Sequence, residues 1–368
     1  MPKKYFLTPG PSELYYTVAD HMRTALSNGI PSISHRSKAF EEIFKHAVTE
    51  LRKLLDIPTD YHVVFTNSAN EIWERLLQNC VEKESFHLVH GSFSKKFAAF
   101  AKQLNKKAVV HEVPFGEAFD ISQVEIPASA ELIAAIANET SAGVATLPES
   151  IYQLKEQNPE ALLVVDAVSA VPFIEVDFSK IDSLYFSVQK GMGLPAGLGV
   201  WIFNDRCVQK AETLKQKGQA IGTYHSIPSL VDKAAKNQTP ATPNVLGIYL
   251  LGKVCEDMNR RTVAVIRQEM IYKAALIYGL LERHPDFEPF VQDKKHRSQT
   301  VIVANILNGG TSSEVIEVLE KSGLTVGTGY GENKQRQIRI ANFPTHSKEL
   351  FERLYDLLEP MRFSASKA

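Results

Sequence analysis

The chain has 368 residues, and its 41 Lys and Arg against 42 Asp and Glu give a formal net charge of -1, which argues against a general nucleic-acid or anionic-membrane binder. A content of 44% hydrophobic and 23% charged residues is that of an ordinary globular protein, and the length predicts about two domains. Cys80, Cys207 and Cys255 lack metal-ligand spacing, and no apolar run predicts a signal peptide or a membrane span, so a reducing cytoplasm is expected.

Helices and strands are predicted to alternate along the N-terminal half. Residues 1–15 are expected to form an irregular arm, because Pro9, Gly10 and Pro11 interrupt regular structure. Apolar residues at helical spacing predict a helix over 38–55, and a strand over Tyr61–Phe65 precedes a helix that begins near Asn70. Further strands are predicted at 86–90, 108–113, 161–168, 183–188 and 199–203, and helices at 94–104 and around 131–138, where a strand fits equally well.

This alternation predicts an α/β fold with a mainly parallel sheet covered on both faces. A long helical region follows from about residue 245 to 281. Beyond it, short strands at 300–306, 324–329 and 337–343 alternate with helices at 312–323 and 348–361. We therefore expect a large domain over 1–250, including the arm, and a smaller α+β domain over 251–368.

Asp166 and Lys190 are the first candidates for chemistry. Asp166 ends the apolar strand at 161–168, and Lys190 follows the next strand on a glycine-rich loop. Ligands of open α/β sheets bind at the carboxyl ends of the strands. A lysine there can form a Schiff base with an aldehyde cofactor, and an aspartate can hold a pyridine nitrogen protonated. Either residue alone is more often a helix cap or a solvated side chain, so the case depends on further motifs.

Further motifs accompany this pair along nearly the whole chain: TPGPS at 8–12, SHRS at 34–37, IPTDYHVVF at 57–65, NETSAGV at 138–144, TPNVLGIYLLG at 242–252 and QIRIANF at 337–343. In this order they resemble the class V aminotransferases, which are pyridoxal-phosphate enzymes of fold type I, and among these the phosphoserine aminotransferases most. The resemblance implies a large domain with a mainly parallel seven-stranded sheet, a smaller α+β C-terminal domain, and a homodimer with shared active sites.

The same resemblance implies how pyridoxal 5'-phosphate is held. Lys190 carries the cofactor covalently as a Schiff base and shuttles the proton, while Asp166 pairs with the pyridinium nitrogen. Thr140 donates to the phenolate oxygen, and Phe93 stands where the family has a stacking tryptophan. The remaining implied cofactor contacts, mostly to the phosphate and with Thr242 reaching across from the neighbouring subunit, come from Ser68, Ala69, Asn70, Ser169, Gln189 and Thr242.

For the substrate, the resemblance implies that Arg339 binds the α-carboxylate and that His35 and Arg36 bind the acidic side chain. A bidentate arginine suits a carboxylate best. Three further places depart from the family pattern. Residues 67–70 lack the usual glycines, Ala241 replaces the asparagine before Thr242, and 329–333 (GYGEN) replaces a second basic cluster.

Other functions fit the residues less well. A cysteine desulfurase needs a nucleophilic cysteine in the C-terminal domain, but no cysteine follows Cys255. A dinucleotide-dependent oxidoreductase needs a GxGxxG loop, which the segment at 65–70 (FTNSAN) lacks. A non-catalytic binder would have no reason to keep Lys190, Asp166 and Arg339 together. The expected function is phosphoserine:2-oxoglutarate amino transfer in serine biosynthesis, and the alternative is a small-amino-acid transaminase of the alanine/serine–glyoxylate type that uses pyruvate or glyoxylate.

Overall fold

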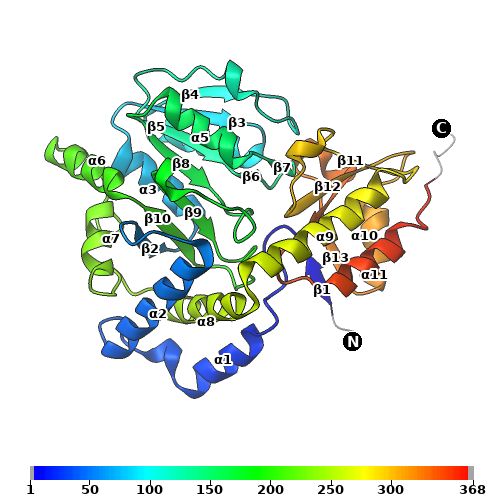
Figure 1. Ribbon diagram of the computed structural model, residues 1–368, viewed down its shortest axis with the longest axis horizontal. Coiled ribbons are helices and arrows are strands. Elements are labelled where there is room, and N and C mark those ends of the chain that lie inside the picture. Colours follow the sequence, from blue (N-terminus) through cyan, green and yellow to red (C-terminus); the bar gives the residue numbers. More distant parts are fainter. Residues whose placement is uncertain (1–3, 364–368) are drawn as a thin grey trace.

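The computed structural model describes residues 4–363 and has a large and a small part (Figure 1). The centre of the large part is a seven-stranded sheet in which only β10 runs antiparallel to its neighbours, which confirms the predicted mainly parallel sheet. In spatial order its strands are β2 (His62–Thr66), β10 (Gly199–Phe203), β9 (Ser183–Ser187), β8 (Leu162–Asp166), β5 (Leu132–Ile136), β3 (Glu84–Val89) and β4 (Lys107–Glu112).

Helices cover both faces of this sheet because its central strands are apolar on both sides. In β5, Leu132 and Ala134 pack into one core, whereas Ile133 and Ala135 pack into the other. The first core is closed by α3 (Ala69–Cys80), α4 (Ser92–Gln103), α6 (Asp205–Gln216) and α7 (Ile227–Ala234). The second is closed by α1 (Val18–Ser27), α2 (Lys38–Leu55), α5 (Pro148–Gln157) and α8 (Val245–Arg261).

Of the two readings left open for the segment at 131–138, the strand is correct, because Leu132–Ile136 forms β5. A helix would present one apolar face, whereas the residues of β5 alternate between two buried cores and pair with β3 and β8. A short hairpin follows, formed by β6 (Asn138–Glu139) and β7 (Val144–Ala145).

The small part is a five-stranded sheet with helices against it. The strand order is β1 (Tyr5–Leu7), β13 (Leu324–Thr328), β14 (Gln337–Ala341), β12 (Val301–Ile306) and β11 (Phe287–Pro289). The helices are α9 (Val263–Leu281), α10 (Ser312–Lys321) and α11 (Lys348–Leu358), and a 3-10 turn, η5, covers Gly331–Gln335. Leu7 lies in the core of this part.

One sequence expectation about chain organisation needs adjustment. The arm is not wholly irregular, because Tyr5–Leu7 pairs with β13 of the small sheet through backbone contacts that no local pattern reveals. The expected division at residue 250 falls inside α8, whose buried face belongs to the large core. The chain enters the small core only within α9, where Met270 packs on the large side and Ala274 on the small side.

No helix in the described part of the chain is long and apolar enough to cross a membrane. Within residues 4–363, no group of three or more His, Cys, Asp or Glu side chains could hold a metal ion. The three cysteines are free and buried.

Candidate active site

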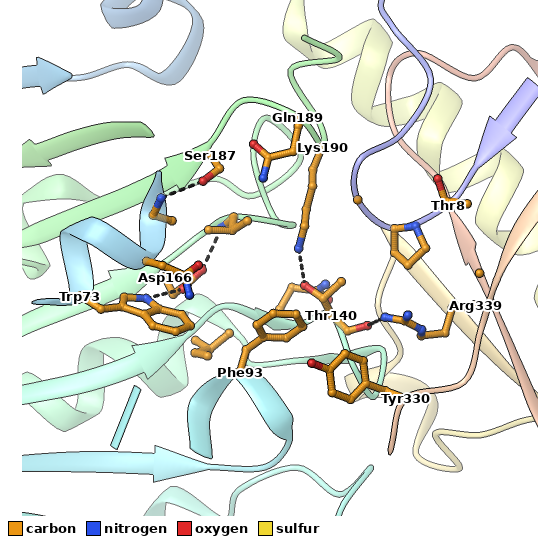
Figure 2. Close-up of a pocket in the computed structure, with 18 of the residues that line it drawn as sticks. Thr8, Trp73, Phe93, Thr140, Asp166, Ser187, Gln189, Lys190, Tyr330 and Arg339 are labelled. Atoms are coloured by element: carbon orange, nitrogen blue, oxygen red, sulfur yellow. Dashed lines mark hydrogen bonds between the residues drawn. The ribbon is translucent and has the colours of Figure 1, made fainter. Parts of the chain in front are cut away.

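A cavity of about 400 Å³ opens at the carboxyl ends of β8 and β9, between the large and small parts. Figure 2 shows Lys190 reaching across it towards Thr140, with Asp166 and Trp73 on one side and Tyr330 and Arg339 on the other. The predicted site residues that line the cavity are Ala69, Asn70, Phe93, Thr140, Asp166, Gln189, Lys190 and Arg339. Residues that lie far apart in the sequence therefore meet at one place.

Lys190 is held by a chain of hydroxyl groups. Its Nζ lies 2.8 Å from Thr140 Oγ1, and that hydroxyl lies 2.8 Å from Ser169 Oγ. Ser169 in turn donates to the backbone oxygen of Asn138 at 2.9 Å. Ser169 does not line the cavity itself, so its role is to hold the Thr140 hydroxyl in position by a hydrogen bond.

Asp166 is a buried carboxylate without a cationic partner among the described residues. Trp73 Nε1 donates to one of its oxygens at 3.0 Å, and the amide of Val168 donates to the other at 3.0 Å. Burial raises the pKa of Asp166 to about 6, against the effect of these donors and of the Lys190 charge. Such a group is suited to a protonated ring nitrogen, which would supply the missing positive charge.

Burial shifts the pKa of Lys190 in the direction opposite to that of Asp166. It lowers the pKa of the Lys190 amine to about 8, although the carboxylates of Asp166 and Glu139 favour the charged form. A lysine whose ammonium form is destabilised in this way is neutral over much of the mildly alkaline range. The neutral amine is the form that attacks an aldehyde or accepts a proton.

The start of α3 forms one end of the cavity. Ser68 caps the helix by accepting from the amide of Glu71, and the amide of Ala69 donates to Ser187 Oγ at 2.8 Å. The first amides of a helix suit a phosphate, and Asn70 and Gln189 line the cavity beside them. The buried Gln189 Oε1 lacks a hydrogen-bond partner among the described residues, which is consistent with a polar ligand at this end.

In the segment at 67–70, which lacks the family's glycines, Glu71 holds Asn67 by hydrogen bonds. The Asn67 amide and side chain donate to its carboxylate at 2.8 and 3.0 Å, so the Asn67 side chain is tied to Glu71. His225 contacts the second carboxylate oxygen. Neither Asn67 nor Ser68 lines the cavity, so the contribution of Ser68 here is the helix cap.

Arg339 forms the other end, on β14 of the small sheet. Its Nε donates to Thr328 O at 2.7 Å, and its Nη1 donates to Thr140 O at 3.3 Å. Its guanidinium carbon lies 5.4 Å from the centre of the Tyr330 ring, and that ring lies 5.6 Å from Phe93. No carboxylate among the described residues pairs with Arg339, so the guanidinium is free to bind a ligand carboxylate by donating hydrogen bonds to it.

Three predicted site residues lie away from this cavity. His35 and Arg36 precede α2, and Arg36 donates to Gln238 Oε1 at 2.9 Å and to the backbone oxygens of Thr239 at 2.7 Å and Pro240 at 3.2 Å. Thr242 follows that segment and is exposed. Within one chain, none of these three residues lines the cavity around Lys190, and Arg36 is bonded to the segment that precedes Thr242.

Sequence reasoning missed several cavity residues. Ser187 ends β9, and the carboxyl end of a predicted strand was a usable signal for it. Trp73 lies one turn into α3, where an apolar residue at helical spacing predicts a core position and not a site residue. Thr8, Pro9 and Gly10 belong to the TPGPS motif, but the motif did not predict their place in the cavity, which depends on the pairing of β1 with β13.

A large α/β part with a buried lysine at the strand ends, and a small part that supplies an arginine, define an aminotransferase of fold type I. The family model described as Aminotransferase class-V matches residues 4–334. The chain belongs to the class V aminotransferase family.

Known proteins agree with this assignment. The crystal structure of a phosphoserine aminotransferase from Cytophaga hutchinsonii matches with a TM-score of 0.95 and 50% identity, covering 98% of this chain and 99% of that one. A phosphoserine aminotransferase from Nocardioides sp. strain JS614 is 26% identical over 91% of this chain and 89% of its own length. An aspartate aminotransferase from Thermus thermophilus, 22% identical with a TM-score of 0.84 over 96% and 98% of the two chains, shares the fold.

Proposed function

We propose that this chain is a pyridoxal-phosphate-dependent aminotransferase that moves the amino group of phosphoserine to 2-oxoglutarate. The observation that carries the proposal is one cavity in which three groups meet. They are the buried amine of Lys190, the buried carboxylate of Asp166, which has no cationic partner among the described residues, and the guanidinium of Arg339, which pairs with no carboxylate among them. These groups match the aldehyde, the ring nitrogen and the α-carboxylate of a cofactor–substrate pair.

The cofactor, when bound, accepts the amino group and stabilises the electron pair left at Cα. Lys190 would hold the cofactor covalently and, once displaced by the donor, move the proton between Cα and the cofactor carbon. Its depressed pKa favours both tasks. Asp166 would keep the ring nitrogen protonated, and Trp73 and the Val168 amide fix both carboxylate oxygens for that purpose. Arg339 would orient Cα by binding the α-carboxylate.

The positions of the remaining charged residues support an amino-donor substrate with an acidic side chain. Glu332, in the segment that stands where the family has a second basic cluster, faces a separate groove with Lys95 and Glu112 and does not line the cavity. Phosphoserine is also the substrate named for the Cytophaga and Nocardioides relatives. The second candidate, a small-amino-acid transaminase, is favoured by the fact that Lys190 and Arg339 are the only cations of this chain among the described cavity residues.

A homodimer with shared sites resolves that shortage of cations. His35, Arg36 and Thr242 come from separate segments that lie together, and Arg36 binds the backbone just before Thr242. Both segments lie outside the chain's own cavity, so we propose that they complete the cavity of a partner chain. We also propose a division into residues 1–250 and 251–368 as domains, and a cytoplasmic location, which three free thiols suit.

The test is the visible absorbance of the purified protein and its half-reactions. Wild type should bind pyridoxal phosphate and show the band of the lysine-linked cofactor, and Lys190→Ala should lack it. Phosphoserine should discharge the band faster than alanine or serine by at least about tenfold, since about 1.4 kcal/mol of differential binding gives that factor. A colourless wild type would overturn the cofactor assignment, and equal rates for phosphoserine and alanine would favour the small-amino-acid alternative.

A further inference from the structure

The N-terminal arm lies beside Lys190 in the fold, although the two are far apart in the sequence. Thr8, Pro9 and Gly10 line the cavity, and in Figure 2 the arm passes beside the lysine. Two backbone hydrogen bonds tie the following residues to the loop that carries Lys190. The Ser12 amide donates to Gln189 O at 3.1 Å, and the Tyr15 amide donates to Gly193 O at 2.8 Å. Because β1 pairs with β13, the arm joins the small sheet to the lysine loop.

Gly10 is the point of closest approach. A β-carbon built on Gly10 would lie 2.8 Å from Cε of Lys190, 3.1 Å from its Cγ and 3.4 Å from its Cδ. The φ angle of Gly10 is +135°, which side chains with a β-carbon rarely adopt. The bare Cα of Gly10 therefore leaves the space through which the lysine methylenes run.

The far end of the lysine is fixed as well. Nζ lies 2.8 Å from Thr140 Oγ1 and 5.2 Å from the centre of the Phe93 ring. A lysine has four rotatable bonds and loses considerable rotamer freedom when it is confined. The Gly10 backbone along the methylenes and the Thr140 hydroxyl at Nζ together restrict the Lys190 side chain to one extended conformation.

We propose that Gly10 is a positioning residue for Lys190. Its backbone guides the lysine side chain so that Nζ ends at Thr140, where the cofactor aldehyde would be bound. The role of Lys190 rests on the proposed function, but the contact between Gly10 and Lys190 can be tested without any cofactor.

The first experiment is a double-mutant cycle on the cofactor-free protein. Gly10→Ala should lower the Tm by more in the wild-type background than in Lys190→Ala, by about 2 °C or more, because the added methyl then has no lysine to meet. Backbone strain at φ +135° is present in both backgrounds and cancels. Gly218→Ala is the matched control, since Gly218 has φ +77° and, apart from its two chain neighbours, no described residue comes within 4 Å of the added carbon, so its two Tm shifts should be equal.

Equal shifts for Gly10→Ala in the two backgrounds would overturn the proposal. Failure of Gly10→Ala to fold in both backgrounds would overturn it too, because the loss would then not depend on Lys190. Failure to fold only when Lys190 is present would support it.

The second experiment measures how fast pyridoxal phosphate becomes linked to Lys190. The linkage is trapped by reduction with borohydride, and the mass of the peptide that contains the lysine is then measured by mass spectrometry. Gly10→Ala should bind the cofactor but link it at least tenfold more slowly than wild type or Gly218→Ala, and linkage at the wild-type rate would contradict the proposal. A wild-type chain that takes up no cofactor would contradict the proposed function instead, and the Tm cycle would still decide the role of Gly10.

Discussion

The carboxylate of Asp166 is placed where ionisation is unfavourable in the cofactor-free protein. Burial raises its pKa to about 6, so between about pH 4 and pH 6 the folded protein keeps a proton that the unfolded chain has lost. Since the unfolded state then binds fewer protons, the free energy of unfolding falls as the pH rises through this window. Two pKa units correspond to about 3 kcal/mol as an upper limit.

The Asp166→Asn variant isolates this effect because an amide does not titrate. In the cofactor-free protein, the Tm of Asp166→Asn minus the Tm of wild type should grow from pH 4 to pH 6 and then level off. The measurement is a series of thermal melts that stops near pH 6.5, below the range in which Lys190 titrates. A difference that stays constant or shrinks over the window would mean that Asp166 is already ionised in the folded protein.

At the scale of elements, the start of α4 depends on Glu139 of β6. This fully buried carboxylate accepts from the amides of Phe93 at 3.3 Å and Ser94 at 3.0 Å, and from the amide of Ser141 at 3.1 Å. The hydroxyls of Ser94 and Ser141 also donate to it, at 3.0 and 2.6 Å. Since Phe93 is the second residue of α4, the carboxylate also sets the ring beside Lys190.

Glu139→Gln should therefore lower the free energy of unfolding by about 1.5–3 kcal/mol, because one oxygen becomes an amide group that faces donors. Urea unfolding of the cofactor-free protein measures this loss. Glu149→Gln, at an exposed position in the first turn of α5, should change stability by less than about 0.5 kcal/mol. Equal effects of the two substitutions would show that the Glu139 contacts contribute little.

Elements with one clear periodicity could be predicted from the sequence, and the others could not. The helix over Lys38–Leu55 has the predicted bounds because its apolar residues keep helical spacing and Ser37 caps it. The β5 run was ambiguous because a strand buried on both faces has no period. The candidate site was predicted where motifs carry it, as at Asp166 and Lys190. Gly10 escaped prediction because its partner lies 180 positions further along the chain and is met only through tertiary structure.

At the scale of the whole molecule, the arrangement of cations is the main unexplained feature of a single chain. The net charge is only -1, and of the cations implied to bind substrate, Arg339 alone lines the cavity. Arg36 is bound to the backbone at Thr239 and Pro240 instead. If a partner chain receives these residues, each active site needs Lys190 from one chain and Arg36 from the other.

Heterodimers test this arrangement directly. Arg36→Ala and Lys190→Ala chains, co-expressed with different affinity tags, should each be nearly inactive with phosphoserine as homodimers. The doubly purified heterodimer should recover about half of the wild-type activity, because one of its two sites combines an intact Lys190 with an intact Arg36. An Arg36→Ala/Lys190→Ala double variant paired with wild type is the control, since it leaves each site with one defect and should be nearly inactive. A heterodimer no more active than the sum of its parents would mean that Arg36 serves its own chain or no site at all.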